Sequence, residues 1–137
     1  MSGRPILLDT CAALWLVGGQ LARDAETLVV EVWSDDIQVL VSPITAWEVG
    51  MLVAKDRLTL TAPVSTWFEK LLELGVALAE LSPAVLIAST ELRAPELTDP
   101  SDRIIAATAR AFNYRLMTRD RPLLAYASRG QVTAIPC

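Results

Sequence analysis

The sequence predicts an α/β protein, a three-layer α/β/α sandwich with a mainly parallel central sheet. Short apolar runs alternate along the chain with amphipathic stretches, as in strands joined by crossover helices. The first run, ILL at residues 6–8, is continuously apolar, which is typical of a strand covered on both faces. Of the 137 residues, 53% are hydrophobic. We therefore expect one domain over residues 1–137 with a sizeable core.

The predicted elements follow one another closely. The strands are expected at residues 5–9, 37–41, 76–81, 115–118 and 131–135. The helices are expected at residues 10–17, 21–34, 44–58, 63–74, from 83 to 91, from 100 to a turn near 113, and at 122–127. Thr10 is the expected N-cap of the first helix, and Gly75 follows the fourth, where a left-handed residue is favoured. Asp35 and Asp36 are interpreted as a solvated turn.

The clearest helix start is DPSD at residues 99–102. Asp99 suits the N-cap, Pro100 suits the first helical position, and Asp102 suits the third, from which a carboxylate can reach back to the cap. This capping box explains both aspartates structurally. A third aspartate, Asp120, follows the next predicted strand and favours a functional explanation in addition.

The composition excludes several kinds of chemistry. The chain has no histidine, which excludes His-based nucleophile triads, His acid–base pairs and His-ligated zinc or iron. It has two lysines and neither GxxxxGK[ST] nor GxGxxG, which argues against P-loop chemistry. The two cysteines, Cys11 and Cys137, make neither a disulfide framework nor a zinc site. Any catalysis must therefore rest on carboxylates and on cations that prefer oxygen ligands.

Charge is unevenly distributed along the chain. Residues 1–90 hold five Lys or Arg against eleven Asp or Glu, a net charge of −6, whereas residues 91–137 hold seven Arg against five acids, a net charge of +2. Arginines beside carboxylates are commonly ion pairs on a solvated surface. As a group around a metal site they also suit a phosphodiester, which the guanidinium fork matches. The arginines that flank the proposed acids are Arg103, Arg110, Arg115, Arg119, Arg121 and Arg129.

Two more acids stand in apolar surroundings. Asp9 ends the first strand, at the edge where α/β sheets bind ligands, and a buried aspartate needs a partner such as a cation. Capping of the next helix is the alternative. Glu48 lies among apolar helix residues, either at the edge of the core or facing a site, and Asp9 as a possible co-ligand favours the site.

Together with Asp102 and Asp120, Asp9 and Glu48 would form a quartet of carboxylates that repel one another unless divalent cations neutralise them. Mg²⁺ or Mn²⁺ suits such an oxygen-only site. Water activated by the metal can attack a phosphorus in line, without any histidine.

Four segments resemble the successive motifs of PIN-domain ribonucleases, in particular the VapC-type toxins of bacterial toxin–antitoxin pairs. These segments are LLDT (7–10), the WE that ends at Glu48, DPSDRIIAATA (99–109) and MTRD (117–120), and the resemblance runs from residue 6 to about residue 135. It implies a metal-binding quartet with one accessory acid: Asp9, Glu48, Asp102 and Asp120, with Asp99. It also implies that the Thr118 hydroxyl steadies a ligand or water.

The resemblance further implies dependence on Mg²⁺ or Mn²⁺, endonucleolytic cleavage of RNA, a homodimer, and inhibition by a cognate antitoxin. Two departures bear on substrate choice. Leu97 and Thr98 stand where the family often has His-Arg, and Ser101 stands where it often has an aromatic residue.

Two other functions are compatible with the acids. One is a phosphatase or receiver that forms an acyl phosphate on Asp9; such sites use a nearby lysine, and Lys55 and Lys70 lie in segments predicted to be peripheral. The other is a non-catalytic PIN-like module that binds RNA or a partner, against which the intact quartet argues.

The surface predictions concern partners and location. We expect one or two of the tryptophans to contact a partner, because aromatic residues are enriched at interfaces. The apolar runs fall short of the roughly 18 residues that span a bilayer, and the first run stops at Asp9, too early for a signal peptide. We therefore expect a cytoplasmic protein with no membrane contact. The tryptophans are Trp15, Trp33, Trp47 and Trp67.

Overall fold

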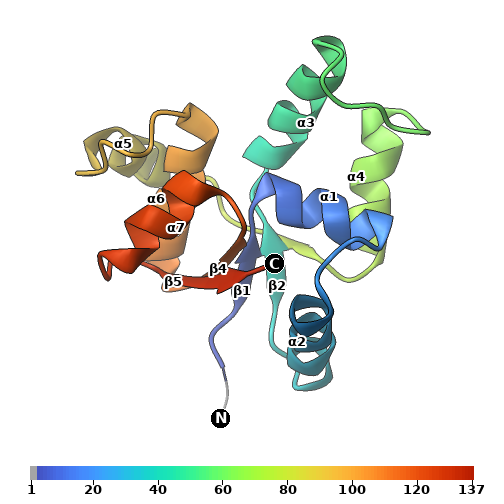
Figure 1. Ribbon diagram of the computed structural model, residues 1–137, viewed down its shortest axis with the longest axis horizontal. Coiled ribbons are helices and arrows are strands. Elements are labelled where there is room, and N and C mark those ends of the chain that lie inside the picture. The colour runs from blue at the N-terminus through green and yellow to red at the C-terminus, as the bar shows by residue number, and fades with distance from the viewer. Residues whose placement is uncertain (1–2) are drawn as a thin grey trace.

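The computed structural model describes residues 3–137 as a five-stranded sheet between two groups of helices (Figure 1). The strand order is β3-β2-β1-β4-β5, and every pairing is parallel. The predicted sandwich is confirmed, with a sheet that is parallel throughout. The strands are β1 (Ile6–Leu8), β2 (Val39–Val41), β3 (Ala77–Leu78), β4 (Arg115–Thr118) and β5 (Thr133–Pro136).

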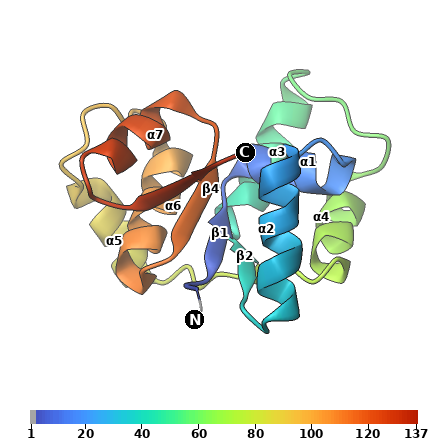
Figure 2. The same ribbon diagram turned by 60° about the horizontal axis from the view of Figure 1, so that its bottom comes forward.

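The helices cover both faces of the sheet. Helices α1 to α4 lie on one face and α5 to α7 on the other (Figures 1 and 2). Among the described residues, none of them is long and apolar enough to cross a membrane. Their bounds are α1 (Thr10–Gly18), α2 (Arg23–Ser34), α3 (Ile44–Ala54), α4 (Val64–Glu73), α5 (Pro83–Glu91), α6 (Pro100–Phe112) and α7 (Arg121–Ser128).

Each central strand contributes to two cores. Successive side chains of a strand point to opposite faces, so Ile6 and Leu8 pack with α1 to α4, whereas Leu7 packs with α5 to α7. All three side chains are completely buried. Strands β2 and β4 alternate in the same way between the two cores. This double burial explains why the run ILL contains no polar residue.

Several predicted boundaries are wrong by a few residues. The helix predicted at 44–58 ends at Ala54, and the chain turns at Asp56, whose φ is 57°. Strand β3 has two residues instead of the six predicted, because it pairs only with β2 at the edge of the sheet. The predicted turns are confirmed: Asp36 has a φ of 58°, and Gly75 has a φ of 114° directly after the C-cap of α4.

The register of the central strands aligns their carboxyl ends. Leu8 of β1 pairs with Val41 of β2 and with Met117 of β4. The residues that follow these strands therefore meet at the same edge of the sheet, where α1, α3 and α7 begin. This edge is where α/β sheets usually bind ligands.

Substitution of Leu7 by alanine tests the two-core arrangement. Because Leu7 is completely buried, Leu7→Ala should lower the free energy of unfolding by about 2–5 kcal/mol, measured by urea denaturation. Val30→Ala on α2, where the valine is 55% exposed, should change it by less than about 0.5 kcal/mol. Equal effects of the two substitutions would contradict the burial described here.

Candidate active site

The carboxylate of Asp9 is buried at the carboxyl end of the central strand. Its side chain is 3% exposed. One oxygen accepts a hydrogen bond from the Ala12 backbone N–H at 2.7 Å, and the other accepts from the Thr118 hydroxyl at 2.5 Å. Asp9, and not Thr10, is thus the N-cap of α1, because Asp9 keeps an extended backbone while Thr10 is already helical. The capping explanation is confirmed, and the same residue lies at the predicted site.

Thr10 instead connects α1 with α3. Its hydroxyl donates to Oε1 of Glu48 at 2.5 Å and lies 3.1 Å from the hydroxyl of Thr45. Thr45 and Glu48 are three residues apart on α3 and so share one face of the helix. Neither threonine was among the predicted site residues. Their places, directly after Asp9 and one turn before Glu48, are the signal that could have identified them.

The remaining acids lie at the starts of α6 and α7. Asp99 caps α6 by accepting from the Ser101 N–H at 2.8 Å. Asp120 caps α7 by accepting from the Leu123 N–H at 3.3 Å, and its own N–H donates to Thr118 at 3.0 Å. Thr118 therefore positions both Asp9 and Asp120, which agrees with the steadying role that the resemblance implied for its hydroxyl.

Asp102 differs from the other acids of this cluster. Its carboxylate takes part in no hydrogen bond among residues 3–137, so the predicted reach back to the cap of α6 is absent. It is influenced instead by the charges of Asp120, Asp99, Glu48 and Asp9. Burial first, and repulsion from these acids second, raise the pKa of Asp102 to about 8.

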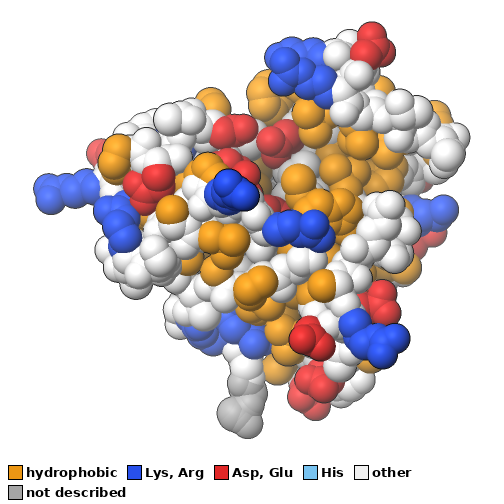
Figure 3. All heavy atoms as spheres, in the orientation of Figure 1, with side chains coloured by type: hydrophobic (Ala, Val, Ile, Leu, Met, Phe, Trp, Pro, Cys, Tyr) orange, Lys and Arg blue, Asp and Glu red, His pale blue; other side chains and the backbone are white. Residues whose placement is uncertain are grey.

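Two other members of the cluster respond in the same way. Burial is the main cause that raises the pKa of Asp9, and repulsion from Asp120 adds to it. Burial also raises the pKa of Glu48, with repulsion from Asp99 and Asp9. The structure thus brings together all of the predicted site residues. Figure 3 shows acidic side chains gathered between α3 and the α6–α7 side of the molecule.

The donor chemistry of the cluster fits a hard divalent cation. Its ligand atoms are carboxylate and hydroxyl oxygens, which Mg²⁺ and Mn²⁺ prefer. A cation would also relieve the repulsion that raises the pKa values. Among residues 3–137, however, no group of three or more His, Cys, Asp or Glu side chains is arranged to hold a metal as it stands. The acids are gathered at one place without yet forming a chelating cluster.

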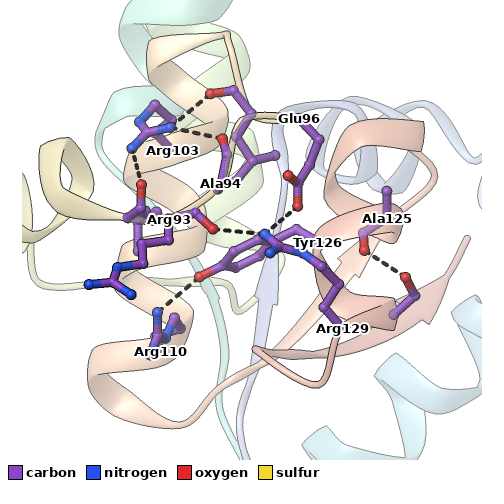
Figure 4. Close-up of polar contacts among 11 residues, drawn as sticks. Arg93, Ala94, Glu96, Arg103, Arg110, Ala125, Tyr126 and Arg129 are labelled. Carbon is purple, nitrogen blue, oxygen red and sulfur yellow. Dashed lines mark hydrogen bonds and ion pairs between the residues drawn. The ribbon is translucent and has the colours of Figure 1, made fainter.

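The arginines near the acids mostly bind the protein itself. Arg103 donates to the backbone carbonyls of Ser89, Leu92, Ala94 and Leu97, and thereby holds the loop before α6 (Figure 4). The pair of Arg129 with Glu96, at 2.6 Å, is the only salt bridge among the described residues. Ion pairing as the general explanation of these arginines is therefore wrong.

The other arginines lead to the same conclusion. Arg110 donates to the Tyr126 hydroxyl (Figure 4), and Arg115 donates to the backbone carbonyl of Arg4. Arg119 donates to the carbonyl of Cys137 and lies 4.0 Å from the ring centroid of Trp15. These arginines therefore do not form a common cluster around the acids, because their guanidinium groups bind carbonyls and aromatic side chains elsewhere. Arg121, directly after Asp120, is exposed and takes part in no side-chain hydrogen bond or salt bridge among residues 3–137.

The fold and the site define a class of protein, an α/β domain that gathers carboxylates at the carboxyl edge of a parallel sheet. Residues 6–128 match the PIN domain family, and the chain belongs to this family. It is 31% identical over 129 residues to Ribonuclease VapC22 of Mycobacterium tuberculosis, covering 93% of this chain and 96% of that relative. The chain is thus a VapC-type ribonuclease homologue, and the resemblance read from the sequence is confirmed.

Solved structures share the fold. The structure of VapBC2 from Rickettsia felis, bound to a DNA fragment from its promoter, matches with a TM-score of 0.67 and 17% identity over 96% of this chain and 98% of that chain. FitAcB from Neisseria gonorrhoeae matches with a TM-score of 0.51 and 22% identity over 95% and 96%. At these identities the likeness concerns the fold alone.

The raised pKa of Asp102 predicts how stability depends on pH without metal. The carboxyl has an ordinary pKa of 3.8 and a pKa of about 8 in the folded protein, so folding favours its protonated form. Stability should therefore fall as the pH rises from about 4 to 8. The substitution Asp102→Asn should remove part of this loss. At pH 8 the free energy of unfolding that it restores should be about 1–2 kcal/mol, after allowance for solvent screening.

Urea denaturation in EDTA at pH 5 and pH 8 measures this effect. Asp24→Asn, at an exposed position of α2, is the matched control and should leave the pH dependence unchanged. Equal stability of the unsubstituted protein at both pH values would show that Asp102 is not held in its protonated form.

Proposed function

We propose that this chain is the toxin of a toxin–antitoxin pair and cleaves RNA endonucleolytically with the aid of Mg²⁺ or Mn²⁺. The observation that carries the proposal is the convergence of five carboxylates at one sheet edge in a protein without histidine. The family membership and the similarity to a ribonuclease support RNA as the substrate. The proposed metal ligands are Asp9, Glu48, Asp102 and Asp120, with Asp99 as an accessory acid.

The residues of the chain have separate tasks in this mechanism. A divalent ion held by Asp9, Glu48, Asp102 and Asp120 would activate a water molecule for attack and would stabilise charge at the phosphodiester. Thr118 and the Ala12 N–H fix the orientation of the Asp9 carboxylate, and Thr10 fixes that of Glu48. Asp102 holds a proton up to about pH 8 in the absence of a cation. Release of this proton therefore accompanies cation binding, which should be stronger at higher pH.

The acyl-phosphate alternative is disfavoured by the surroundings of Asp9. Such a site needs a lysine beside the nucleophile, whereas Lys55 and Lys70 line cavities to which Asp9 does not belong. Lys55 is less peripheral than the sequence suggested, because it lines a cavity together with Glu48 and Asp99. This position is compatible with binding a phosphate, but Asp9 is not among the residues that line the cavity.

A second candidate function is a non-catalytic PIN-like module that binds RNA or a partner. The observation in its favour is that the acids do not form a ready-made metal cluster among the described residues. The two candidates differ in one property, because only the nuclease needs the carboxylates for turnover.

A partner surface is proposed on the face of the sheet that carries α1 and α4. A groove of about 500 Å³ is lined by Trp15 and Trp67, by other apolar residues of α1, and by the loop at residues 58–62. An extended or helical antitoxin segment with apolar side chains would suit it. The predicted role of one or two tryptophans at a partner surface stays a prediction, and Trp15 and Trp67 are the candidates in this groove.

The remaining expectations concern assembly and location. A homodimer is proposed through the edge strand β3 and the middle of α5, where Leu78, Leu86 and Ile87 are 52%, 40% and 59% exposed. Large exposed apolar side chains of this kind are common at interfaces. An arginine of the antitoxin that enters the acid cluster would mimic the charge of the metal. The cytoplasmic location stays a prediction.

Cleavage of RNA in Mn²⁺ is the first test of the nuclease. Purified protein should cut structured cellular RNA at discrete sites, and mapping of the new 5′ ends should identify them. EDTA should reduce the rate of RNA cleavage by about 100-fold or more, because it removes the metal. Asp9→Asn and Asp120→Asn should each have the same effect, because asparagine keeps the helix cap but removes the charge. Asp24→Asn should leave the rate unchanged.

Two results would contradict the nuclease. If the Asp9→Asn variant cleaved RNA in Mn²⁺ at the rate of the unsubstituted protein, the proposed mechanism would be wrong. Uncut RNA, together with binding of RNA by the folded protein, would favour the non-catalytic module.

A bulky charge in the groove tests the antitoxin surface. Thr66 is exposed and lines the groove, so Thr66→Arg should weaken binding of the cognate antitoxin at least tenfold while RNA cleavage is unchanged. Isothermal titration calorimetry measures the affinity. Ser65→Arg is the control, since Ser65 is the exposed neighbour on α4 outside the groove lining. Equal affinity of both variants would place the antitoxin on another surface.

A further inference from the structure

A small cavity lies directly beside the acid cluster. Its volume is about 210 Å³, and it separates α3 from the start of α6. Two of the proposed site acids, Glu48 and Asp99, belong to its lining. The remaining lining residues are Trp47, Met51, Leu52, Lys55, Arg57, Pro100 and Ser101.

Helix geometry arranges one wall of this cavity. Trp47, Met51 and Lys55 are spaced by four residues and therefore lie along one stripe of α3 and its C-cap. Trp47 and Glu48 both line the cavity, so the indole ring and a proposed metal ligand border the same space. The wall presents an aromatic face, a thioether and an ammonium group in line.

Trp47 is more exposed than a core role requires. Its side chain is 56% exposed, whereas Trp67 is 6% exposed and contributes to the core. An exposed indole leaves a large apolar surface in water, which is unfavourable unless a partner covers it. The position beside Glu48 and Asp99 limits what that partner can be, because it must fit next to an acidic site.

Two basic residues at the cavity are not engaged with the protein. Lys55 and Arg57 are both exposed, and neither takes part in a side-chain hydrogen bond or salt bridge among the described residues. The protein has a net charge of −4, and its acid cluster repels a polyanion. Basic groups close to the acids are therefore needed to hold a phosphate near them.

We propose that Trp47, Lys55 and Arg57 form a nucleotide subsite for the RNA substrate, in which one unpaired base stacks on Trp47 and the two cations bind its phosphate. Bases of single-stranded RNA are commonly held by aromatic stacking. The cavity is smaller than pockets for drug-sized ligands, about 300–1,000 Å³, and so suits one base. The inference rests on the proposed function, since it assumes an RNA substrate.

The subsite predicts that cleavage requires an unpaired nucleotide next to the cut bond. A paired base is stacked within a helix and cannot lie on Trp47. The nuclease should therefore prefer loops and single-stranded segments, and the identity of the stacked base should contribute to the choice of cleavage site.

Binding measurements separate stacking from charge. Full-length protein carrying Asp120→Asn, which prevents cleavage, is titrated in Mg²⁺ with fluorescein-labelled decauridylate or decaadenylate, and inorganic polyphosphate serves as a polyanion without bases. Trp47→Ala should weaken RNA binding about 5- to 150-fold and leave polyphosphate binding unchanged. Trp47→Phe should keep most of the RNA affinity. Lys55→Gln and Arg57→Gln should each weaken the binding of both RNA and polyphosphate.

The controls match the substituted residues in kind. Phe112 is an exposed aromatic residue at the far end of α6, about 16 Å along the helix from Ser101, so Phe112→Ala should leave RNA binding unchanged. Arg23→Gln on α2 is the charge control, because Arg23 is exposed and does not line this cavity.

Three results would overturn the subsite. The first is that the Trp47→Ala variant binds RNA with wild-type affinity. The second is that this variant loses as much affinity for polyphosphate as for RNA. The third is that light scattering shows a dimer dissociated by Trp47→Ala, which would assign the indole to a protein interface. Failure of the subsite alone is recognised when protein with Asp120 intact cleaves RNA in Mn²⁺ but Trp47→Ala binds RNA normally. If that protein neither cleaves nor binds RNA, the subsite and the proposed function are both wrong.

Discussion

The buried carboxylate of Asp9 is the constraint on which the rest of the site depends. A charged group that is 3% exposed must be compensated by hydrogen bonds, and its two donors come from different parts of the chain. The Ala12 N–H belongs to the first turn of α1, and the Thr118 hydroxyl lies at the end of β4. Satisfying Asp9 therefore fixes the start of α1 and the adjoining ends of β1 and β4. Thr118 also binds the backbone of Asp120, so the second strand-end acid is positioned by the same residue.

The acids combine structural and functional demands in the same side chains. Asp9, Asp99 and Asp120 each cap a helix, which stabilises the fold, whereas their proximity to one another raises the electrostatic energy. Asp102 is the one aspartate of the cluster that caps no helix, and burial and repulsion raise its pKa to about 8. In the proposed metal site, this loss of stability in the metal-free protein is the counterpart of affinity for a cation. Strained electrostatics of this sort are common where proteins bind metals or catalyse reactions.

The cations of the protein fall into two groups with different tasks. Most arginines of the C-terminal third hold loops and helix ends, as Arg103 does for the segment before α6. Lys55 and Arg57 come from the acidic part of the sequence, yet they lie beside the acid cluster and bind nothing within the described residues. Net charge along the sequence therefore gives no indication of Lys55 and Arg57, which lie in its acidic part. The proposed nucleotide subsite lies at α3 and the start of α6, whereas the proposed antitoxin groove lies at α1, the loop at residues 58–62 and α4. Separate substitutions should therefore affect them independently.

The sequence by itself determined the fold class, the places of most helices and strands, and the acids Asp9, Glu48, Asp99, Asp102 and Asp120. These features depend on local information: hydrophobic period, capping residues and the kind of residue that follows a strand. Only the tertiary structure decided the partners of these residues. Thr118 and Asp9 are 109 residues apart, Thr10 and Glu48 are 38 apart, and the targets of Arg103 are backbone carbonyls that carry no sequence signal. Such contacts arise when strands pair and helices pack. Spacing within one segment can place Thr10 next to Asp9, but it cannot reveal that Thr10 binds Glu48 on another helix.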